Sequence, residues 1–172
     1  MPDQTSLSDQ MQSRPIVPPP FRGAMLRLES DLPFVDLGDG SQMQLIQVDL
    51  AQGLWIVRML FHPGCRIDRH YHTGPVYAFT LSGAWHYEEY PEEVNRAGAF
   101  LFEPAGSVHT LRTLPGSDEP ADVWFAVFGA NVNMTYDDQV SGIVDAASVL
   151  GIYRALCKAQ GLSSDKVIVL GE

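Results

Sequence analysis

Short apolar runs separated by turn residues fill the middle of the chain, from Met25 to Phe128. The runs are rich in β-branched and aromatic residues, and pairs such as Pro63-Gly64 and Ser82-Gly83 stand between them. Because these runs follow one another without a helical segment between them, the pattern predicts an all-β sandwich or barrel. The expected strands cover residues 44–50, 54–61, 76–81, 85–90, 99–102, 109–114 and 123–128.

The two ends of the chain have different patterns. Residues 1–22 are polar and rich in proline, which predicts an extended or disordered arm. Beyond a loop that starts near residue 131, Val149, Ile152 and Tyr153 recur at helical spacing and predict a helix from Asp145 to Gln160. The predicted organisation is an arm (1–22), a single barrel (23–130), and a C-terminal loop and helix (131–172) that packs on the barrel or on a partner subunit.

Charge and composition exclude several classes of partner. The 172 residues include 11 Lys+Arg and 21 Asp+Glu, and the formal net charge of -10 repels nucleic-acid phosphates and anionic lipids. The longest apolar stretch, 54–61, contains Arg58 and is much shorter than the roughly 20 residues that span a bilayer. The start of the chain has no signal-peptide core, so we expect a cytoplasmic protein without a membrane or nucleic-acid partner. In that compartment Cys65 and Cys157 are expected to be free thiols.

Three of the five histidines form a candidate metal site. His70 and His72 are separated by one residue, so on a strand both side chains project to the same face. His109 follows a turn that begins at Pro104 and is placed to supply a third nitrogen ligand from another strand. Neutral imidazole suits zinc, iron, copper or nickel, and three protein ligands leave metal positions open for water, oxygen or substrate.

The spacing around these histidines forms two motifs. The first contains Gly64, five residues, His70, one residue, His72, three residues, Val76, six residues and Gly83. The second contains Gly98, five residues, Pro104, one residue, Gly106, two residues, His109, three residues and Thr113. Residues 45–128 thereby resemble the cupin superfamily, which implies a double-stranded β-helix, or jelly-roll barrel, with a metal held inside. Val76 stands where this family usually has a metal-binding glutamate, and Thr113 stands where it often has asparagine.

Glu89 is the sequence-based candidate for the missing carboxylate. If Ser82-Gly83 is a two-residue hairpin loop, counting outward along the ladder places Val76 opposite Glu89, which then points into the barrel. The same count turns Trp85 and Tyr87 inward. The alternative is that Glu89 belongs to a solvated acidic patch, because a one-residue change in loop length reverses every orientation.

A narrower resemblance extends over residues 72–87, 89–90 and 102–111 and over the helical tail. These stretches resemble the 2,4'-dihydroxyacetophenone dioxygenase group of cupins. The resemblance implies a non-haem iron(II) enzyme that uses O2 to cleave an aromatic 2-hydroxyketone into an aromatic carboxylic acid and formate. Three imidazoles accept several metals, so zinc, nickel and manganese stay open as alternatives. Glu89 would bind the metal or accept the substrate proton. An aromatic substrate wall would come from Trp85, Tyr87, Phe100 and Phe102, which a barrel also needs for packing.

The sequence leaves two alternative functions open and also predicts a homo-oligomer. A related cupin group resembling acetylacetone dioxygenase uses three histidines without glutamate to cleave diketones. A non-catalytic metal-binding or sensor cupin, akin to the zinc-binding anti-sigma cupins, is the other alternative. On the outward side of their strand, Tyr77, Phe79 and Leu81 form an apolar face that the N-terminal arm or a partner must bury, so a homodimer or homotetramer is expected.

Overall fold

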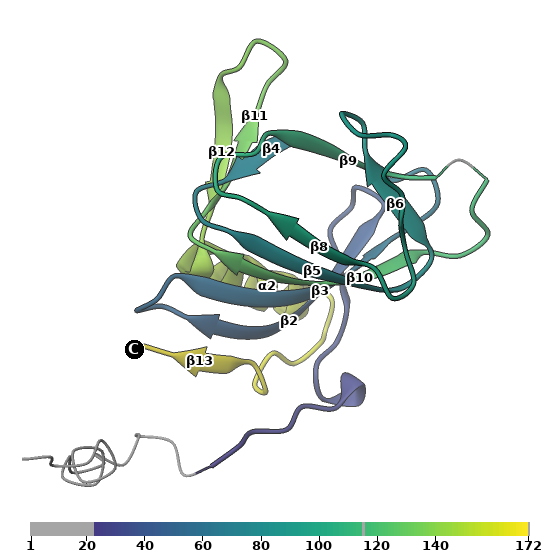
Figure 1. Ribbon diagram of the computed structural model, residues 1–172. Helices are drawn as coiled ribbons and strands as arrows, with labels where there is room; N and C mark the ends of the chain where they lie inside the picture. Colours follow the sequence, from purple (N-terminus) through teal and green to yellow (C-terminus); the bar gives the residue numbers. More distant parts are fainter. Residues whose placement is uncertain (1–22, 115, 172) are drawn as a thin grey trace, which may run out of the picture.

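The computed structural model describes residues 23–114 and 116–171. These residues form two mostly antiparallel sheets that face each other and close into a jelly-roll barrel, as the strand pattern predicts (Figure 1). The predicted N-terminal arm, residues 1–22, lies outside the described residues. Within the described ranges, no helix is long and apolar enough to cross a bilayer.

The first sheet forms one wall of the barrel. Its strands are β1 (Val35–Asp36), β2 (Ser41–Asp49), β3 (Leu54–Phe61), β10 (Ala121–Phe128), β5 (Val76–Ser82) and β8 (Phe100–Glu103), in that spatial order, with the short β13 (Ile168–Leu170) parallel to β2. A 3-10 turn, η1 (Glu29–Asp31), precedes this sheet in the chain. Alternation along β5 turns Val76, Ala78 and Thr80 into the core and leaves Tyr77 and Phe79 outside.

The second sheet forms the opposite wall. Its spatial order is β12 (Val140–Val144), β11 (Asn131–Met134), β4 (Arg66–His72), β9 (His109–Thr113), β6 (Ala84–Tyr87) and β7 (Asn95–Arg96). The sequence predicts a loop that starts near residue 131. In the structure this segment instead forms a hairpin of β11 and β12. Here the structure differs because β11 has a partner in β4, with Asn131 opposite His72 and Asn133 opposite His70.

Gly83 marks a corner where the chain passes from one sheet to the other. Strand β5 pairs with β10 and β8, whereas β6 pairs with β9 and β7, so Ser82-Gly83 does not close the two-residue hairpin considered from the sequence. The backbone of Gly83 has φ +68°, and a Cβ there would clash with the carbonyl oxygen of Pro120 and lie 2.7 Å from Cα of Ala121. Only glycine fits both the conformation and the space.

The C-terminal helix α2 (Ala146–Ala159) confirms the predicted change of period. Asp145 is its N-cap and accepts a hydrogen bond from the backbone N–H of Ser148 at 2.8 Å, while the hydroxyl of Ser148 accepts one from the N–H of Asp145. The helix buries Val149 and Tyr153 against its own barrel, where it packs on β1, β2 and β12. The Tyr153 hydroxyl donates to the carbonyl of Pro33 at 2.6 Å.

Candidate metal centre

The three predicted ligands meet inside the barrel. His70 and His72 come from β4 and His109 comes from β9, where it pairs directly with His70. One ligand atom from each residue lies within 4.8 Å of the others, and all three side chains are buried. Strand alternation explains the arrangement, because His70 and His72 share the inward face while Tyr71 between them does not. This buried group of imidazoles can hold a metal ion.

Hydrogen bonding prepares the histidines as ligands. Nδ1 of His70 lies 2.7 Å from the carbonyl oxygen of Asp68, which only accepts, so this nitrogen carries the proton and Nε2 is left as a lone-pair donor. Nδ1 of His72 and Nε2 of His109 are buried without a hydrogen-bond partner. Buried polar atoms without partners are costly, and a bound cation satisfies them. The site therefore fits a metal on the chemistry of its own atoms.

Burial also keeps the imidazoles neutral. Desolvation, together with a smaller effect of the neighbouring histidines, lowers the pKa of His72 to about 3 and that of His109 to about 2. The pKa of His70 is lowered for the same reason, although its bond to Asp68 opposes the shift. Metal ions bind the neutral ring, so the folded chain presents its ligands in the correct protonation state.

Glu103 is a buried acid at this centre that the sequence did not predict. It is 3% exposed, and its Oε2 lies 3.5 Å from Nε2 of His72 and 3.4 Å from Nε2 of His109. Its Oε1 accepts a hydrogen bond from the hydroxyl of Tyr87. Burial raises the pKa of Glu103 to about 7, although the Tyr87 bond acts in the opposite direction. The centre thus contains a carboxyl group that can change protonation state near neutral pH.

Glu89 does not occupy the predicted position. Its carboxylate accepts hydrogen bonds from the backbone N–H of Thr110 at 2.8 Å and from the Thr110 hydroxyl at 3.0 Å, and the residue is exposed. The inward orientation expected from the sequence is wrong because it depended on a hairpin between β5 and β6, and those strands lie in different sheets. The residue opposite Val76 is Glu103.

The four predicted wall residues divide into three groups. Tyr87 is buried, and its ring stacks on His109 with centroids 4.0 Å apart and an interplanar angle of 22°. Trp85 is fully buried and donates to the Thr80 hydroxyl at 3.0 Å, so it is a core residue. The expectation that Phe100 and Phe102 face the barrel interior is wrong, because alternation along β8 turns Leu101 and Glu103 inward instead.

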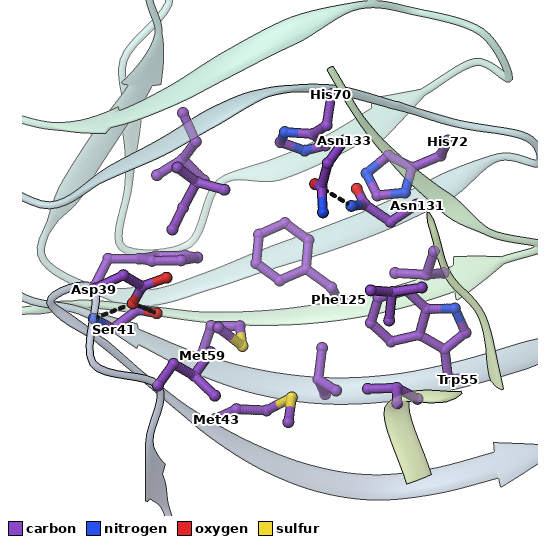
Figure 2. A pocket seen from close by; sticks show the side chains of 18 of the residues that line it. Asp39, Ser41, Met43, Trp55, Met59, His70, His72, Phe125, Asn131 and Asn133 are labelled. Atoms are coloured by element: carbon purple, nitrogen blue, oxygen red, sulfur yellow. Dashed lines mark hydrogen bonds between the residues drawn. The ribbon is translucent and has the colours of Figure 1, made fainter. Parts of the chain in front are cut away.

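An apolar cavity of about 290 Å³ extends from the histidines into the barrel (Figure 2). Phe125 lies between the histidines and the floor, where Met43 and Met59 lie, and Trp55 stands below His72. Asn131 and Asn133 lie beside the histidines, joined by a 2.8 Å hydrogen bond between their side chains. Helix α2 contributes Val149 and Ile152 to the lining. The cavity offers a largely apolar compartment, with the histidines and asparagines at the metal-binding end and Asp39 and Ser41 at another side of the lining.

A second, more polar cavity of about 540 Å³ lies beside the same centre. His109, Tyr87 and Glu103 contribute to its lining, together with Phe100 and Phe102. Tyr87 and Glu103 line both cavities. The buried carboxyl and its tyrosine partner are therefore reached from two sides.

Comparison with known proteins agrees with this architecture. Residues 23–127, more than half of the chain, match the family described as the ChrR cupin-like domain. The chain belongs to this cupin family. A cupin-like protein of unknown function from Ralstonia eutropha JMP134 is 34% identical, with a TM-score of 0.70 over 76% of this chain and 80% of the other. A search of curated proteins gives no match.

More distant cupins share the fold. An RmlC-like cupin from the same organism is 22% identical, with a TM-score of 0.78 over 87% of this chain and 96% of the other. An acetylacetone dioxygenase from Acinetobacter johnsonii is 16% identical, with a TM-score of 0.66 over 79% of this chain and 93% of the other. At these identities the likeness establishes a common barrel and not a common reaction.

Proposed function

We propose that this cupin is a non-haem iron(II)-dependent dioxygenase that cleaves the carbon-carbon bond of an aromatic 2-hydroxyketone such as 2,4'-dihydroxyacetophenone. The products are an aromatic carboxylic acid and formate. One atom of O2 enters each product, so one ketone and one O2 give one 4-hydroxybenzoic acid and one formic acid without a further reductant. The observation that carries the proposal is the buried histidine group at the end of an apolar cavity, beside a buried carboxyl.

The three histidines would hold the iron. A bound iron(II) supplies Lewis acidity, which makes a coordinated 2-hydroxyketone more acidic, and electrons for the reaction with O2. Three protein ligands leave room for the carbonyl and hydroxyl oxygens of the ketone. The charge on the metal would also replace the missing partners of the orphaned nitrogens of His72 and His109.

Glu103 is placed to take the proton that the substrate loses. Its Oε2 is buried without a hydrogen-bond partner and lies within 3.5 Å of nitrogen atoms of His72 and His109. Burial raises the pKa of this carboxyl in the metal-free protein, which favours acceptance of a proton from the substrate. Tyr87 holds the other carboxyl oxygen by donating its hydroxyl proton, and its own pKa is raised well above the usual value by burial.

The apolar cavity is where the aryl group would lie. Its lining is dominated by aliphatic, methionine and aromatic side chains, and Phe125 offers a ring in the middle of it. Such a compartment excludes water from the reacting carbon and favours an aromatic ring over a polar chain. An apolar cavity of this size next to the histidines also favours a small-molecule reaction over a purely structural metal site.

Oxygen consumption by the anaerobically purified, iron(II)-loaded protein tests the proposal. The substrates are 2,4'-dihydroxyacetophenone and acetylacetone, with product acids quantified by chromatography. We expect uptake with the hydroxyketone, equal amounts of 4-hydroxybenzoate and formate, and loss of both in His109→Ala. His62→Ala is the matched control, because His62 is exposed and lies in the turn before Pro63-Gly64, outside the centre. No uptake with any ketone by protein shown to contain iron would remove the proposal.

A non-catalytic metal-binding role is the second candidate, because a buried group of three histidines can hold a metal ion without any reaction taking place. The same assay separates the two. A binding protein would retain zinc through purification and gel filtration and consume no oxygen after exchange to iron. Uptake with acetylacetone alone would instead indicate a diketone-cleaving enzyme.

A further inference from the structure

Two asparagines of β11, here named the asparagine pair, lie beside the histidines on the inward face of the second sheet. Asn131 is opposite His72 and Asn133 is opposite His70 in the antiparallel ladder between β11 and β4. Directly opposite residues share a face and have Cβ atoms about 4.5–5.5 Å apart, so both amides are neighbours of the ligand imidazoles. Both asparagines line the apolar cavity, and Figure 2 shows their amide groups close to the two histidine rings.

The fold alone does not explain the asparagine pair. Asparagine has low strand propensity, yet β11 lies between two other strands, β4 and β12. The lining around the pair is mostly apolar, and it includes Val144, which is opposite Asn131, as well as Trp55 and Val127. A valine at either position would suit both the sheet and this lining better than an amide does. Two amides here therefore indicate a role in binding.

Each amide leaves one of its polar groups free. Nδ2 of Asn131 donates a hydrogen bond to Oδ1 of Asn133 at 2.8 Å, and this bond fixes the orientation of both side chains. Within residues 23–114 and 116–171, nothing bonds Oδ1 of Asn131 or Nδ2 of Asn133. Figure 2 shows this nitrogen of Asn133 directed into the cavity and this oxygen of Asn131 directed toward His72. The pair thus offers one hydrogen-bond acceptor and one donor group, side by side, at the metal-binding end.

We infer that the asparagine pair recognises the two adjacent oxygens of a 2-hydroxyketone and selects such ketones against 1,3-diketones. The hydroxyl of the ketone donates to Oδ1 of Asn131, and its carbonyl oxygen accepts from Nδ2 of Asn133. The enolate of a 1,3-diketone has two acceptor oxygens and no donor, so it leaves Oδ1 of Asn131 facing another acceptor. Sites that pair with a ligand hydroxyl reject ligands that lack it. The inference rests on the proposed function, because it names the groups that select that substrate.

The two amides are uncharged, which separates their effect on the ketone from any effect on the metal. An apolar replacement at either position leaves the charge of the centre unchanged, and the three histidines that would hold the metal stay in place. The loss of one hydrogen bond between protein and ligand weakens binding by about 10-fold. A change in ketone affinity at constant metal content therefore reports on the pair itself.

Anaerobic titration calorimetry on the full-length, zinc-loaded protein tests the inference, because zinc does not support oxidation. The probes are 2,4'-dihydroxyacetophenone, its 2-methoxy ether and acetylacetone. The ether keeps both oxygens of the hydroxyketone and loses the hydroxyl donor. Asn131→Leu should weaken binding of the hydroxyketone by about 10-fold and leave the affinities for the ether and acetylacetone nearly unchanged. Asn133→Leu should weaken the hydroxyketone and the ether by about 10-fold each, since both contain the carbonyl.

Gln139→Leu is the matched control. It makes the same change from amide to aliphatic side chain on the same hairpin, at an exposed residue that lines neither cavity of the centre. It should leave all three affinities unchanged. Circular dichroism and zinc content establish that each variant folds and holds its metal.

The outcomes separate this inference from the proposed function. Unchanged affinities in both asparagine variants would overturn the inference, and so would an equal loss for hydroxyketone and ether in Asn131→Leu. Neither result affects the proposed function if the iron-loaded wild type consumes oxygen with the hydroxyketone. Conversely, the expected pattern of affinities without oxygen uptake would support the inference and remove the proposed reaction. The protein would then be a binding protein for 2-hydroxyketones.

Discussion

Val76 and Glu103 lie directly opposite each other on the neighbouring antiparallel strands β5 and β8, and both are buried. Val76 stands at the position where cupins usually have a metal-binding glutamate. The carboxyl that this position lacks is supplied by its cross-strand neighbour, whose side chain shares the inward face. The same inward row continues from Val76 to Val127 and Trp55, both of which line the apolar cavity. A buried carboxyl therefore lies at the centre although residue 76 is valine.

Replacement of this acid should separate chemistry from folding. In Glu103→Gln the side chain keeps its shape and can still accept the Tyr87 hydrogen bond, but it no longer takes a proton. We expect kcat for the hydroxyketone to fall by about 100-fold or more, with an unchanged circular dichroism spectrum. Glu89→Gln should keep kcat within about threefold, because that side chain is exposed and bound to Thr110. A large loss of kcat in Glu89→Gln with little loss in Glu103→Gln would instead support Glu89 as the acid at the centre, as the sequence suggests.

The corner at Gly83 predicts a large effect of one methyl group. In Gly83→Ala, the Cβ meets the backbone at Pro120 and Ala121, and the φ of +68° is strained for alanine. We expect the free energy of unfolding to fall by about 2 kcal/mol or more, measured by urea denaturation. Gly151→Ala is the opposite control. That glycine is exposed within α2 with nothing near its missing Cβ, so alanine should stabilise the protein by about 0.5–1 kcal/mol.

The stability of the metal-free protein should decrease in mild acid. His72 and His109 have pKa values of about 3 and 2 when folded, against 6.5 in the unfolded chain. Below pH 6.5 the unfolded state therefore binds more protons, and these two residues destabilise the fold as the pH falls. Glu103 acts oppositely between its unfolded pKa of 4.5 and its folded value of about 7. With two histidines opposing one carboxyl, the balance still favours unfolding.

Urea denaturation at pH 7.5, 6.0 and 5.0 measures this pH dependence. Each unopposed histidine contributes about 1.4 kcal/mol per pH unit. His72→Gln should make the dependence shallower, because it removes one of the two strongly shifted histidines. A metal-free protein as stable at pH 5.0 as at pH 7.5 would contradict the burial-induced shifts.

Both thiols should be inert in the native protein. Cys65 and Cys157 are free and buried, and burial raises the pKa of Cys65 to about 11 and also raises that of Cys157. Since the thiolate is the reactive form, a chromogenic disulfide reagent at pH 8 should modify neither residue on a timescale of minutes. Both should react in denaturant. Rapid modification of the folded protein would indicate that α2 opens readily, because Cys157 lies on its buried face.

The histidine site was predictable because its signal is local. His70 and His72 share a face through strand alternation alone, and His109 follows a glycine-proline turn pattern of fixed length. The carboxyl was not predictable by the same means, since the pairing of Val76 with Glu103 joins strands that are distant in the chain. The single acid that follows the apolar run 99–102 was the available signal.

The outward orientation of Phe100 and Phe102 was hidden for a different reason. Strand alternation sorts residues into two faces, but it shows which face is buried only when the other face is polar. Strand β8 carries Phe, Leu, Phe and Glu, so neither face is clearly polar. The inward pair Leu101 and Glu103 is less apolar than the outward pair. Strand β11 was not predicted because its asparagines have low strand propensity, and its pairing with β4 and β12 stabilises it in the structure.

The direct pairing of His70 with His109 makes any bound metal a crosslink between β4 and β9. These strands have an irregular register between Ile67 and His70, so the ladder is interrupted next to the ligands. Metal binding therefore stabilises the second sheet, and a more stable second sheet binds the metal more tightly, with the same coupling free energy in both directions. A substitution that loosens the β4–β9 ladder far from any ligand will weaken metal binding, and a chelator will make that sheet the first part of the barrel to exchange its amide protons.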